Sequence, residues 1–255
     1  MSNDKIIAKN LKVAYGEKVI INQASFTVKE NDIFIIMGGS GCGKSSLLRV
    51  LTGLMPPAGG TFFVNGVNYP EADKDAQLEI MKKIGILYQS GGLFSSMTLA
   101  ENVALPLQKY SDYPPDVIDE LVNLKLALVG LAGYNDYYPA EISGGMKKRA
   151  GLARALALDP EIVYFDEPSA GLDPVSSARL DSLMKDINQN LGTTLVVVTH
   201  ELNSIFAIGT NAIFIDAASK SITAHGSPHE LLKNPPNRTV LNFLTRGTND
   251  EKRTK

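Results

Sequence analysis

Residues 33–51 read IFIIMGGSGCGKSSLLRVL, and this stretch decides the fold class. The apolar run 33–37 has the length and composition of a buried strand. The glycine-rich segment after it fits G-x-x-x-x-G-K-[ST], with Gly38, Gly43, Lys44 and Ser45 at the fixed positions. Leucines at helical spacing follow directly. The stretch therefore predicts a strand, a phosphate-binding loop and a helix in succession.

The composition of this loop suits a nucleotide phosphate. Backbone N–H groups in a glycine-rich turn can point at phosphate oxygens, and the start of the helix adds positive potential. Lys44 is expected to pair with the β- and γ-phosphates, and the Ser45 hydroxyl to bind Mg²⁺. The alternative, a glycine-rich turn that happens to contain Lys-Ser, is disfavoured by the flanking strand and helix. The residues expected to contact the nucleotide here are Gly38, Gly39, Ser40, Gly41, Cys42, Gly43, Lys44, Ser45 and Ser46.

Cys42 lies inside the loop and at the start of the expected helix. A helix N-terminus can acidify a thiol, so that alkylation there would block the nucleotide. A tolerated small residue is the simpler interpretation.

Short, β-branched runs similar to 33–37 recur along the chain at 84–88, 162–165, 195–199 and 212–215. Continuous apolar strands that alternate with helical patterns predict an α/β fold, with a parallel sheet covered on both faces. Two strands over 6–15 and 19–28, joined by a turn at Gly16-Glu17, and a third over 61–66 with an Asn-Gly turn are expected to form an antiparallel layer beside it.

Polar residues follow several of the expected parallel strands. Ligands bind where the carboxyl ends of such strands meet at one edge of a sheet. Asp166 is expected to support the Mg²⁺ shell, and Glu167 to orient an attacking water, since phosphoryl transfer depends mainly on positioned charge. His200 is expected to contact the γ-phosphate, and Gln89 to touch both Mg²⁺ and water. Each residue alone is weak support, but chance poorly explains their arrival at strand ends together.

The bulk properties exclude several classes of protein. A formal net charge of -2 over 255 residues argues against a protein that coats nucleic acid. The single cysteine excludes an intrachain disulfide and makes the cytosol the natural compartment. No apolar run approaches the roughly 20 residues that span a bilayer, and the first residues lack a signal-peptide core. The chain is expected to sit on a membrane protein rather than to cross the membrane itself.

A second glycine-rich helix start lies at Ser143-Gly144-Gly145. Ser143 is a good helix cap, and a bare helix N-terminus suits an anion. The chain has no second P-loop for this element to serve, so a two-fold dimer is expected, in which each helix start closes over the partner's γ-phosphate. An ordinary cap with a tight packing glycine is the alternative, and the motif alone leaves the two even. For the basic run 147–149, a solvated face and attraction of a triphosphate across the interface both remain open.

Taken together, these motifs resemble the ATP-binding-cassette (ABC) ATPases over nearly the whole chain. The motifs that occur in that family's order are the P-loop, Gln89, Ile142-Ser143-Gly144-Gly145, Asp166-Glu167, Ser169-Ala170-Gly171-Leu172-Asp173 and His200. The resemblance implies a P-loop NTPase with a RecA-like parallel core, an antiparallel β-subdomain and an inserted helical subdomain at about 91–160. It also implies one ATP-binding domain over 5–245, ATP and Mg²⁺ as cofactors, and ATP hydrolysis coupled to transport. The polar tail 246–255 is expected to be disordered.

The same resemblance assigns roles to single residues. It makes Tyr15 the aromatic that stacks on adenine and Gln89 a sensor of nucleotide at the transporter interface. It makes Glu167 the catalytic base, with His200 and Lys44 beside it in catalysis, and Asp173 part of a dimer-contacting loop.

Finer features resemble one subfamily, the Mla/Mkl-type ATPases of lipid-trafficking complexes built around MCE proteins. These features are YQSGGLFSSMTLAENVALPL at 88–107 and SGGM at 143–146. The resemblance implies a homodimer at the cytoplasmic face of the inner membrane, beneath an MlaE-like permease, with an MlaD-like MCE-domain lipid-binding protein, often a STAS-domain (MlaB-like) protein, and no nucleic acid. An importer subunit for a small solute such as an amino acid, a soluble non-transport ABC ATPase and a regulator without hydrolysis are the alternatives.

The chain departs from the commonest ABC signature at two positions, Ile142 for Leu and Met146 for Gln. The methionine is what the Mla-type group shows, and it has no evident physical reason.

Two apolar segments are candidates for partner contacts. Leu93, Phe94 and Met97 could receive a short permease helix, or pack in the helical subdomain as expected for Leu99 and Val103. The segment TVLNFL at 239–244 could dock on the chain's own core or on a neighbouring ATPase, and the sequence leaves both open.

Overall fold

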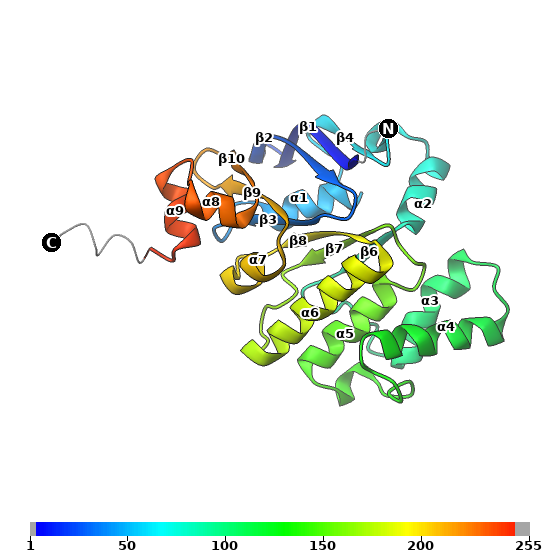
Figure 1. The fold of residues 1–255 in the computed structure, drawn as a ribbon. Helices are drawn as coiled ribbons and strands as arrows, with labels where there is room; N and C mark the ends of the chain where they lie inside the picture. Colours follow the sequence, from blue (N-terminus) through cyan, green and yellow to red (C-terminus); the bar gives the residue numbers. More distant parts are fainter. Residues whose placement is uncertain (1–3, 248–255) are drawn as a thin grey trace. The chain divides into compact units, whose positions relative to one another are not determined.

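The computed structural model describes residues 4–247 and divides into two compact units. The first unit combines the two ends of the chain, Met1–Asp73 and Thr194–Lys255, and the second comprises Lys74–Thr193 (Figure 1). Each unit is described by itself below, as the terminal unit and the middle unit. The tail residues expected to be disordered lie outside the described part of the chain from 248 onward.

Half of the terminal unit is an antiparallel layer. Strands β1 (Asp4–Tyr15) and β2 (Lys18–Lys29) form a hairpin, in which Tyr15 lies opposite Lys18 across the turn at Gly16. Strand β4 (Gly59–Val64) pairs with the other edge of β1, and a turn through Asn65 and Gly66, both at positive φ, leads into β5 (Val67–Asn68). The expected antiparallel strands and both turns are therefore present.

The other half of the terminal unit is mainly parallel. Strand β3 (Ile33–Gly38) lies between β8 (Thr194–Val198) and β9 (Asn211–Asp216) and is parallel to both, and β10 (Ser221–Gly226) runs antiparallel to β9. All residues of β3 and β8 are buried, as continuous apolar strands require. The order of strands in this unit is β5-β4-β1-β2-β10-β9-β3-β8.

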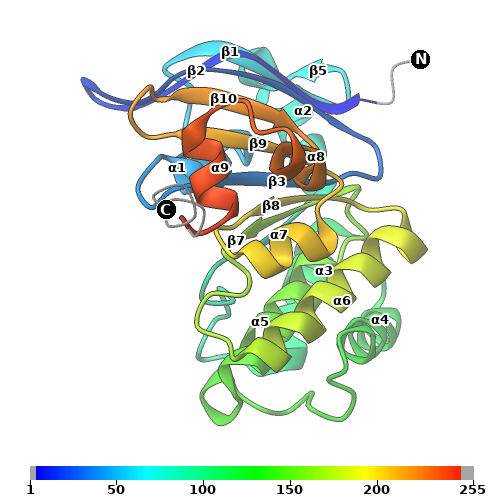
Figure 2. The ribbon, with the colours of Figure 1, turned by 60° about the vertical axis from the view of Figure 1, so that its left-hand side comes forward.

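The helices of the terminal unit are short: η1 (Tyr69–Glu71), α1 (Lys44–Leu51), α7 (Leu202–Ile208), α8 (Pro228–Lys233) and α9 (Arg238–Leu244). Helices α8 and α9 lie beside β9 and β10 (Figure 2). In α9, Val240 and Leu244 are buried, and the Phe243 ring meets the edge of Phe214 with ring centroids 5.2 Å apart. The apolar segment 239–244 therefore docks on the core of its own unit.

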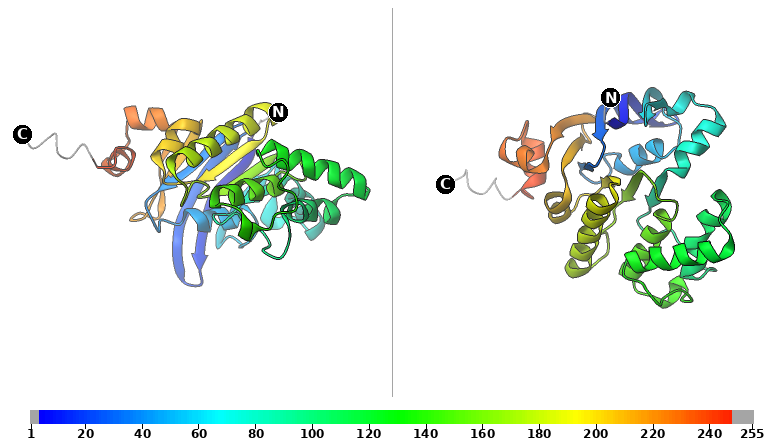
Figure 3. Two further views of the ribbon diagram at one scale, coloured as in Figure 1. Left: turned by 90° about the horizontal axis from the view of Figure 1, so that it is seen from below. Right: turned by 45° about the vertical axis from the view of Figure 1, so that its right-hand side comes forward.

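The middle unit combines one pair of parallel strands with helices. Its elements are α2 (Lys74–Lys82), β6 (Ile84–Leu87), α3 (Leu99–Tyr110), α4 (Pro115–Leu128), η2 (Pro139–Glu141), α5 (Gly144–Ala155), β7 (Ile162–Asp166) and α6 (Pro174–Leu191). Helices α3 and α4 lie side by side (Figure 3), and α5 packs against both. Leu99 and Val103 of α3 are fully buried, which confirms that they belong to the core. Within residues 4–247, no helix is both long and apolar enough to cross a bilayer.

Candidate functional site

The P-loop connects β3 to α1 in the terminal unit, and its backbone needs glycine where it turns. Gly43 has φ 105°, and a Cβ there would come within 2.6 Å of the Ile20 side chain. A Cβ on Gly39 or on Gly41 would meet nothing within 4 Å, so the space beside the loop is open there. The Lys44 ammonium donates to the carbonyl oxygens of Gly38 (3.0 Å) and Gly39 (3.1 Å). An open loop, a helix start and a lysine held across it fit a bound phosphate.

Cys42 is a buried residue of this loop. Burial raises the pKa of its thiol, and the positive charge of Lys44 offsets this only in part. The acidified thiol considered from the sequence is therefore wrong, because burial outweighs the effect of the helix start.

Tyr15, the expected adenine platform, lies beside the helix that the P-loop begins. Its hydroxyl donates to Ser46 Oγ (3.4 Å) and accepts from Arg49 Nη1 (3.1 Å). These two hydrogen bonds lower the pKa of Tyr15, Ser46 contributing most. The tyrosine is 44% exposed. A ring that is oriented by its hydroxyl and open to solvent can stack on a base.

His200 follows the buried end of β8 at the same edge of the sheet as the P-loop. Ile36 of β3 is paired with Val198 of β8, and Thr199 N–H donates to the Ile36 carbonyl (3.3 Å). The His200 imidazole is exposed and lies 3.9 Å from Glu201. The terminal unit thus places Lys44, Ser45 and His200 at the carboxyl ends of neighbouring parallel strands, where ligands bind.

The middle unit gathers the other strand-end residues. Strands β6 and β7 are parallel, with Leu87 opposite Phe165, so Gln89 and the pair Asp166-Glu167 follow them at one edge. Glu167 has φ 48°, a left-handed conformation that costs a non-glycine residue about 1–3 kcal/mol. Such strain persists only where the surrounding structure imposes it, so neighbouring contacts hold the Glu167 backbone in this conformation.

Ser143 caps α5, where its Oγ accepts a hydrogen bond from Met146 N–H (3.3 Å). A Cβ on Gly144 would meet nothing within 4 Å, and one on Gly145 would make only ordinary contacts, the nearest being 3.8 Å from Leu172. Neither glycine has positive φ. Glycine is unfavourable in a helix by up to about 1 kcal/mol relative to alanine, so the packing of this chain gives no reason for either glycine.

Met146 lines a cavity of about 420 Å³ next to this helix start. Arg149 and Arg179 also line it, and Arg149 Nη1 donates to the carbonyls of Val129 (2.9 Å) and Gly130 (3.0 Å). Burial lowers the pKa of Arg149, and the positive charge of Arg179 adds to this. The preceding residue of the helix, Lys148, is buried. A solvated face is therefore the wrong interpretation for Lys148. Arg149 donates hydrogen bonds to backbone carbonyls of its own unit.

Asp173, expected in a dimer-contacting loop, is the cap of α6. Its Oδ1 accepts from the N–H groups of Val175 and Ser176, each at 3.0 Å. Hydrogen bonds from Ser176 are the main cause of its lowered pKa. The carboxylate is thus held ionised at an exposed helix start.

Sequence reasoning missed Asn102, which organises the loop after Gln89. This side chain is fully buried, accepts from Phe94 N–H (2.8 Å) and donates to the carbonyls of Phe94 (3.1 Å), Met97 (3.2 Å) and Thr98 (2.9 Å). Its amide holds the loop so that Phe94 points outward, 50% exposed. The available signal was an amide three residues after Leu99, on the apolar face of the helix.

Each unit offers an oxygen donor of the kind that Mg²⁺ takes when it arrives with a nucleotide. Mg²⁺ is usually held by one or two protein oxygens together with phosphates and water. Ser45 offers a hydroxyl in the first turn of α1, and Asp166 offers a carboxylate at the end of β7. Among residues 4–247, no three His, Cys, Asp or Glu side chains gather to hold a metal ion by themselves.

Comparisons with known proteins agree with the fold and the motifs. A family model described as ABC transporter matches residues 21–170. The intermembrane phospholipid transport system ATP-binding protein MlaF of Escherichia coli (strain K12) is 39% identical over 236 residues, which cover 92% of this chain and 87% of that protein. The probable ribonucleotide transport ATP-binding protein mkl of Mycobacterium tuberculosis (strain ATCC 25618 / H37Rv) is 38% identical over 239 residues, covering 94% of this chain and 66% of that protein.

A solved structure shows the same fold. The ATP-binding cassette MJ0796, in a dimeric post-hydrolysis state bound to ADP and Pi, matches with a TM-score of 0.78 at 28% identity, covering 87% of this chain and 98% of that one. The ABC ATPase fold expected from the motifs is confirmed. Because the family model spans more than half of the chain and the relatives match it over 92% or more, this chain belongs to the ABC transporter family, as an ATPase subunit that couples ATP hydrolysis to transport.

Proposed function

We propose that this ATPase subunit drives the movement of phospholipids between bacterial membranes, as a peripheral protein at the cytoplasmic face of the inner membrane. The observation that carries this proposal is the 39% identity to a phospholipid transport ATPase over 92% of the chain. The second relative is named for ribonucleotide transport at nearly the same identity, so the substrate is what an experiment must decide. The proposed partners are an MlaE-like permease, an MlaD-like MCE-domain protein and a STAS-domain protein.

The proposed chemistry uses the residues at the strand ends. Lys44 binds the β- and γ-phosphates by exchanging the carbonyl oxygens of Gly38 and Gly39 for phosphate oxygens. Ser45 and Gln89 would hold Mg²⁺ and Asp166 would support its shell; the ion, when bound, would neutralise charge on the phosphates. Glu167 orients the attacking water and accepts its proton, while Gln89 and His200 contact the water and the γ-phosphate.

A homodimer would complete each site. Helix α5 begins at Gly144-Gly145, with Ser143 as its cap. The space beside these two glycines is not filled by close packing of this chain. A γ-phosphate of the partner's nucleotide is an occupant of suitable charge. The dimeric state of MJ0796 supports the formation of a dimer.

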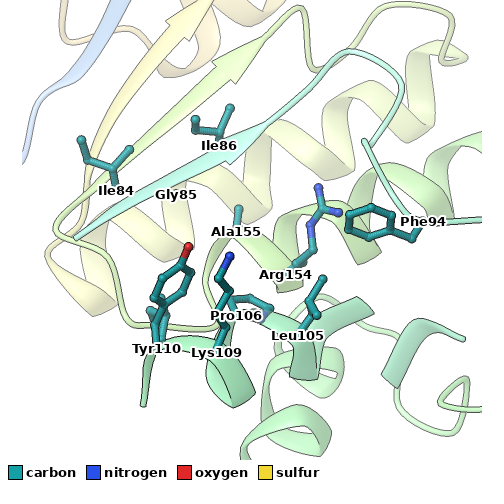
Figure 4. A pocket seen from close by; sticks show the side chains of 11 residues that line it. Ile84, Gly85, Ile86, Phe94, Leu105, Pro106, Lys109, Tyr110, Arg154 and Ala155 are labelled. Atoms are coloured by element: carbon teal, nitrogen blue, oxygen red, sulfur yellow. The ribbon is translucent and has the colours of Figure 1, made fainter. Parts of the chain in front are cut away.

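The permease would dock at a second cavity of the middle unit, of about 340 Å³ (Figure 4). Its wall combines Ile84 and Ile86 of β6 with Phe94, while Lys109 and Arg154 bring positive charge. Arg154 donates to the Gly92 carbonyl (2.6 Å) and lies 5.9 Å from the centre of the Phe94 ring. An apolar wall with basic groups suits a short amphipathic helix that carries an acidic residue. Movement of this helix would reach Gln89 through the loop of Phe94.

Isolation of the membrane complex through an affinity tag on this subunit, followed by mass spectrometry of proteins and lipids, tests the substrate. We expect an integral permease, an MCE-domain protein and bound phospholipid. A solute-binding protein in place of the MCE protein would make the chain an importer subunit, and recovery without any membrane protein would make it a soluble ATPase.

The docking surface has its own test. Phe94→Ala should lower recovery of the permease while ATP binding by the isolated subunit is unchanged. Tyr113→Ala is the matched control, because Tyr113 is a similarly exposed aromatic (53%) of the middle unit that does not line the cavity. Equal recovery with both variants would contradict docking at this cavity.

A further inference from the structure

Lys148 is a buried lysine of α5, with 5% of its surface exposed. Lysine is almost never buried without partners, because its charge is costly to remove from water. Here the ammonium donates to the carbonyl oxygen of Pro168 at 2.6 Å and to that of Ala170. Both acceptors belong to the segment that directly follows Glu167.

The hydrogen bonds from Lys148 to these carbonyls restrain the turn that contains Glu167. The turn is closed by hydrogen bonds from Ala170 N–H to the Glu167 carbonyl (3.2 Å) and from Leu172 N–H to the Ser169 carbonyl (3.0 Å). Glu167 itself is in the left-handed region at φ 48°. A backbone held in that region needs neighbouring contacts that prevent it from relaxing. Lys148 supplies two of these contacts, one to each side of Ser169.

The charge of Lys148 also acts on Glu167. Burial lowers the pKa of Lys148, and the negative charge of Glu167 raises it in part, so the two groups lie within electrostatic reach of each other.

We propose that Lys148 is a positioning residue for ATP hydrolysis, which holds the segment 168–170 from helix α5 and thereby sets the position of Glu167. The inference rests on the proposed role of Glu167 as the base. Because Lys148 lies on the same helix as Ser143-Gly144-Gly145, a ligand that engages this helix start is joined by one rigid element to the base of the same chain. Each site of the proposed dimer would then sense the occupancy of the other through this lysine.

Steady-state ATPase kinetics of Lys148→Met, Lys148→Arg and Lys125→Met test the proposal. Lys125 is the matched control, because it is also a buried lysine of the middle unit (5% exposed) but is paired with Asp159, away from the segment after Glu167. We expect Lys148→Met to lower kcat by about 100-fold, as misplacement of a catalytic group does, with the KM for ATP unchanged. Lys148→Arg should recover part of kcat, and Lys125→Met should lower the thermal unfolding midpoint without lowering kcat.

A second readout separates positioning from folding. Hydrogen exchange of Ala170 and Leu172 N–H groups should accelerate in Lys148→Met and stay unchanged in Lys125→Met. Equal kcat values for both methionine variants, after correction for the folded fraction, would overturn the proposal. Glu167→Gln measured in parallel distinguishes the two failures: wild-type turnover in that variant removes the base itself, whereas an inactive Glu167→Gln beside an unimpaired Lys148→Met removes only the role of Lys148.

Discussion

Gly151 of α5 packs directly against the carbonyl oxygen of Gly91, so closely that a Cβ on Gly151 would stand well inside the 3.0 Å that real side chains respect. The same Cβ would lie 2.9 Å from Leu87, at the end of β6. Glycine at 151 is therefore a condition for the close approach of α5 to the segment that carries Gln89.

Gly151→Ala should destabilise the protein by about 1–3 kcal/mol, because overpacking moves one of two backbones. The midpoint of urea unfolding measures the effect. Gly144→Ala is the control on the same helix, where a Cβ meets nothing within 4 Å and alanine is the better helix former. Its midpoint should be equal to that of the wild type or higher. Equal midpoints in the two variants would show that the Gln89 segment shifts without cost.

Ser143→Arg should lower turnover by about 100-fold, as loss of a preorganised donor to a reacting phosphate does, while the affinity of the monomer for nucleotide stays intact. Titration of the isolated subunit with a fluorescent ATP analogue, beside an ATPase assay at high protein concentration, separates the two quantities. A parallel fall in affinity and turnover would argue against service to the partner's site.

Glu167→Gln should keep ATP binding and lower kcat by about 100- to 10,000-fold, the usual contribution of a general base. The variant should also accumulate as a closed dimer in the presence of ATP, which light scattering detects. Turnover at the wild-type rate would exclude Glu167 as the base.

Tyr15 offers a test of base stacking. Tyr15→Ala should weaken ATP binding by about 1–3 kcal/mol, the range for loss of an aromatic platform under a base. Tyr15→Phe keeps the ring and loses only the hydrogen bonds with Ser46 and Arg49, so it should bind nearly as well as the wild type. Isothermal titration gives both affinities, and equal losses in the two variants would place the contribution in the hydroxyl instead of the ring.

Cys42 should react slowly with thiol reagents. Burial raises its pKa, so at any pH below that value the fraction of thiolate, the reactive form, is smaller than for an exposed cysteine. The rate with Ellman's reagent at pH 8 should therefore be low in the native protein and should rise to the rate of an ordinary thiol in denaturing urea. A fast native reaction would contradict the burial of this side chain.

The sequence was sufficient to predict the fold because its strands are continuous apolar runs and its turns carry glycine at the required positions. Each of the five expected parallel strands is present, as β3, β6, β7, β8 and β9, and so is the hairpin through Gly16. The candidate site residues could be proposed for the same reason, because each directly follows a strand that the sequence makes recognisable.

What the sequence could not supply depends on contacts between segments far apart in the chain. Lys148 is one of a run of three basic residues, and nothing local indicates that it turns inward to carbonyls 20 and 22 residues away. The sequence also could not decide whether α9 packs on its own unit or on a neighbouring subunit. The contact of Phe243 with Phe214, which answers this, depends on the tertiary structure. Asn102 differs in that its place on an apolar helix face was visible, although its four hydrogen bonds were not.

The resting partners of Lys44 bear on how variants at this position are to be understood. Its ammonium donates to the carbonyl oxygens of two successive peptide groups, those of Gly38 and Gly39, and so restrains the backbone at the start of the loop. Lys44→Ala removes these two hydrogen bonds together with the proposed phosphate ligand. A weaker ATP affinity in Lys44→Ala would therefore report two losses together, that of the phosphate ligand and that of the restraint on the loop.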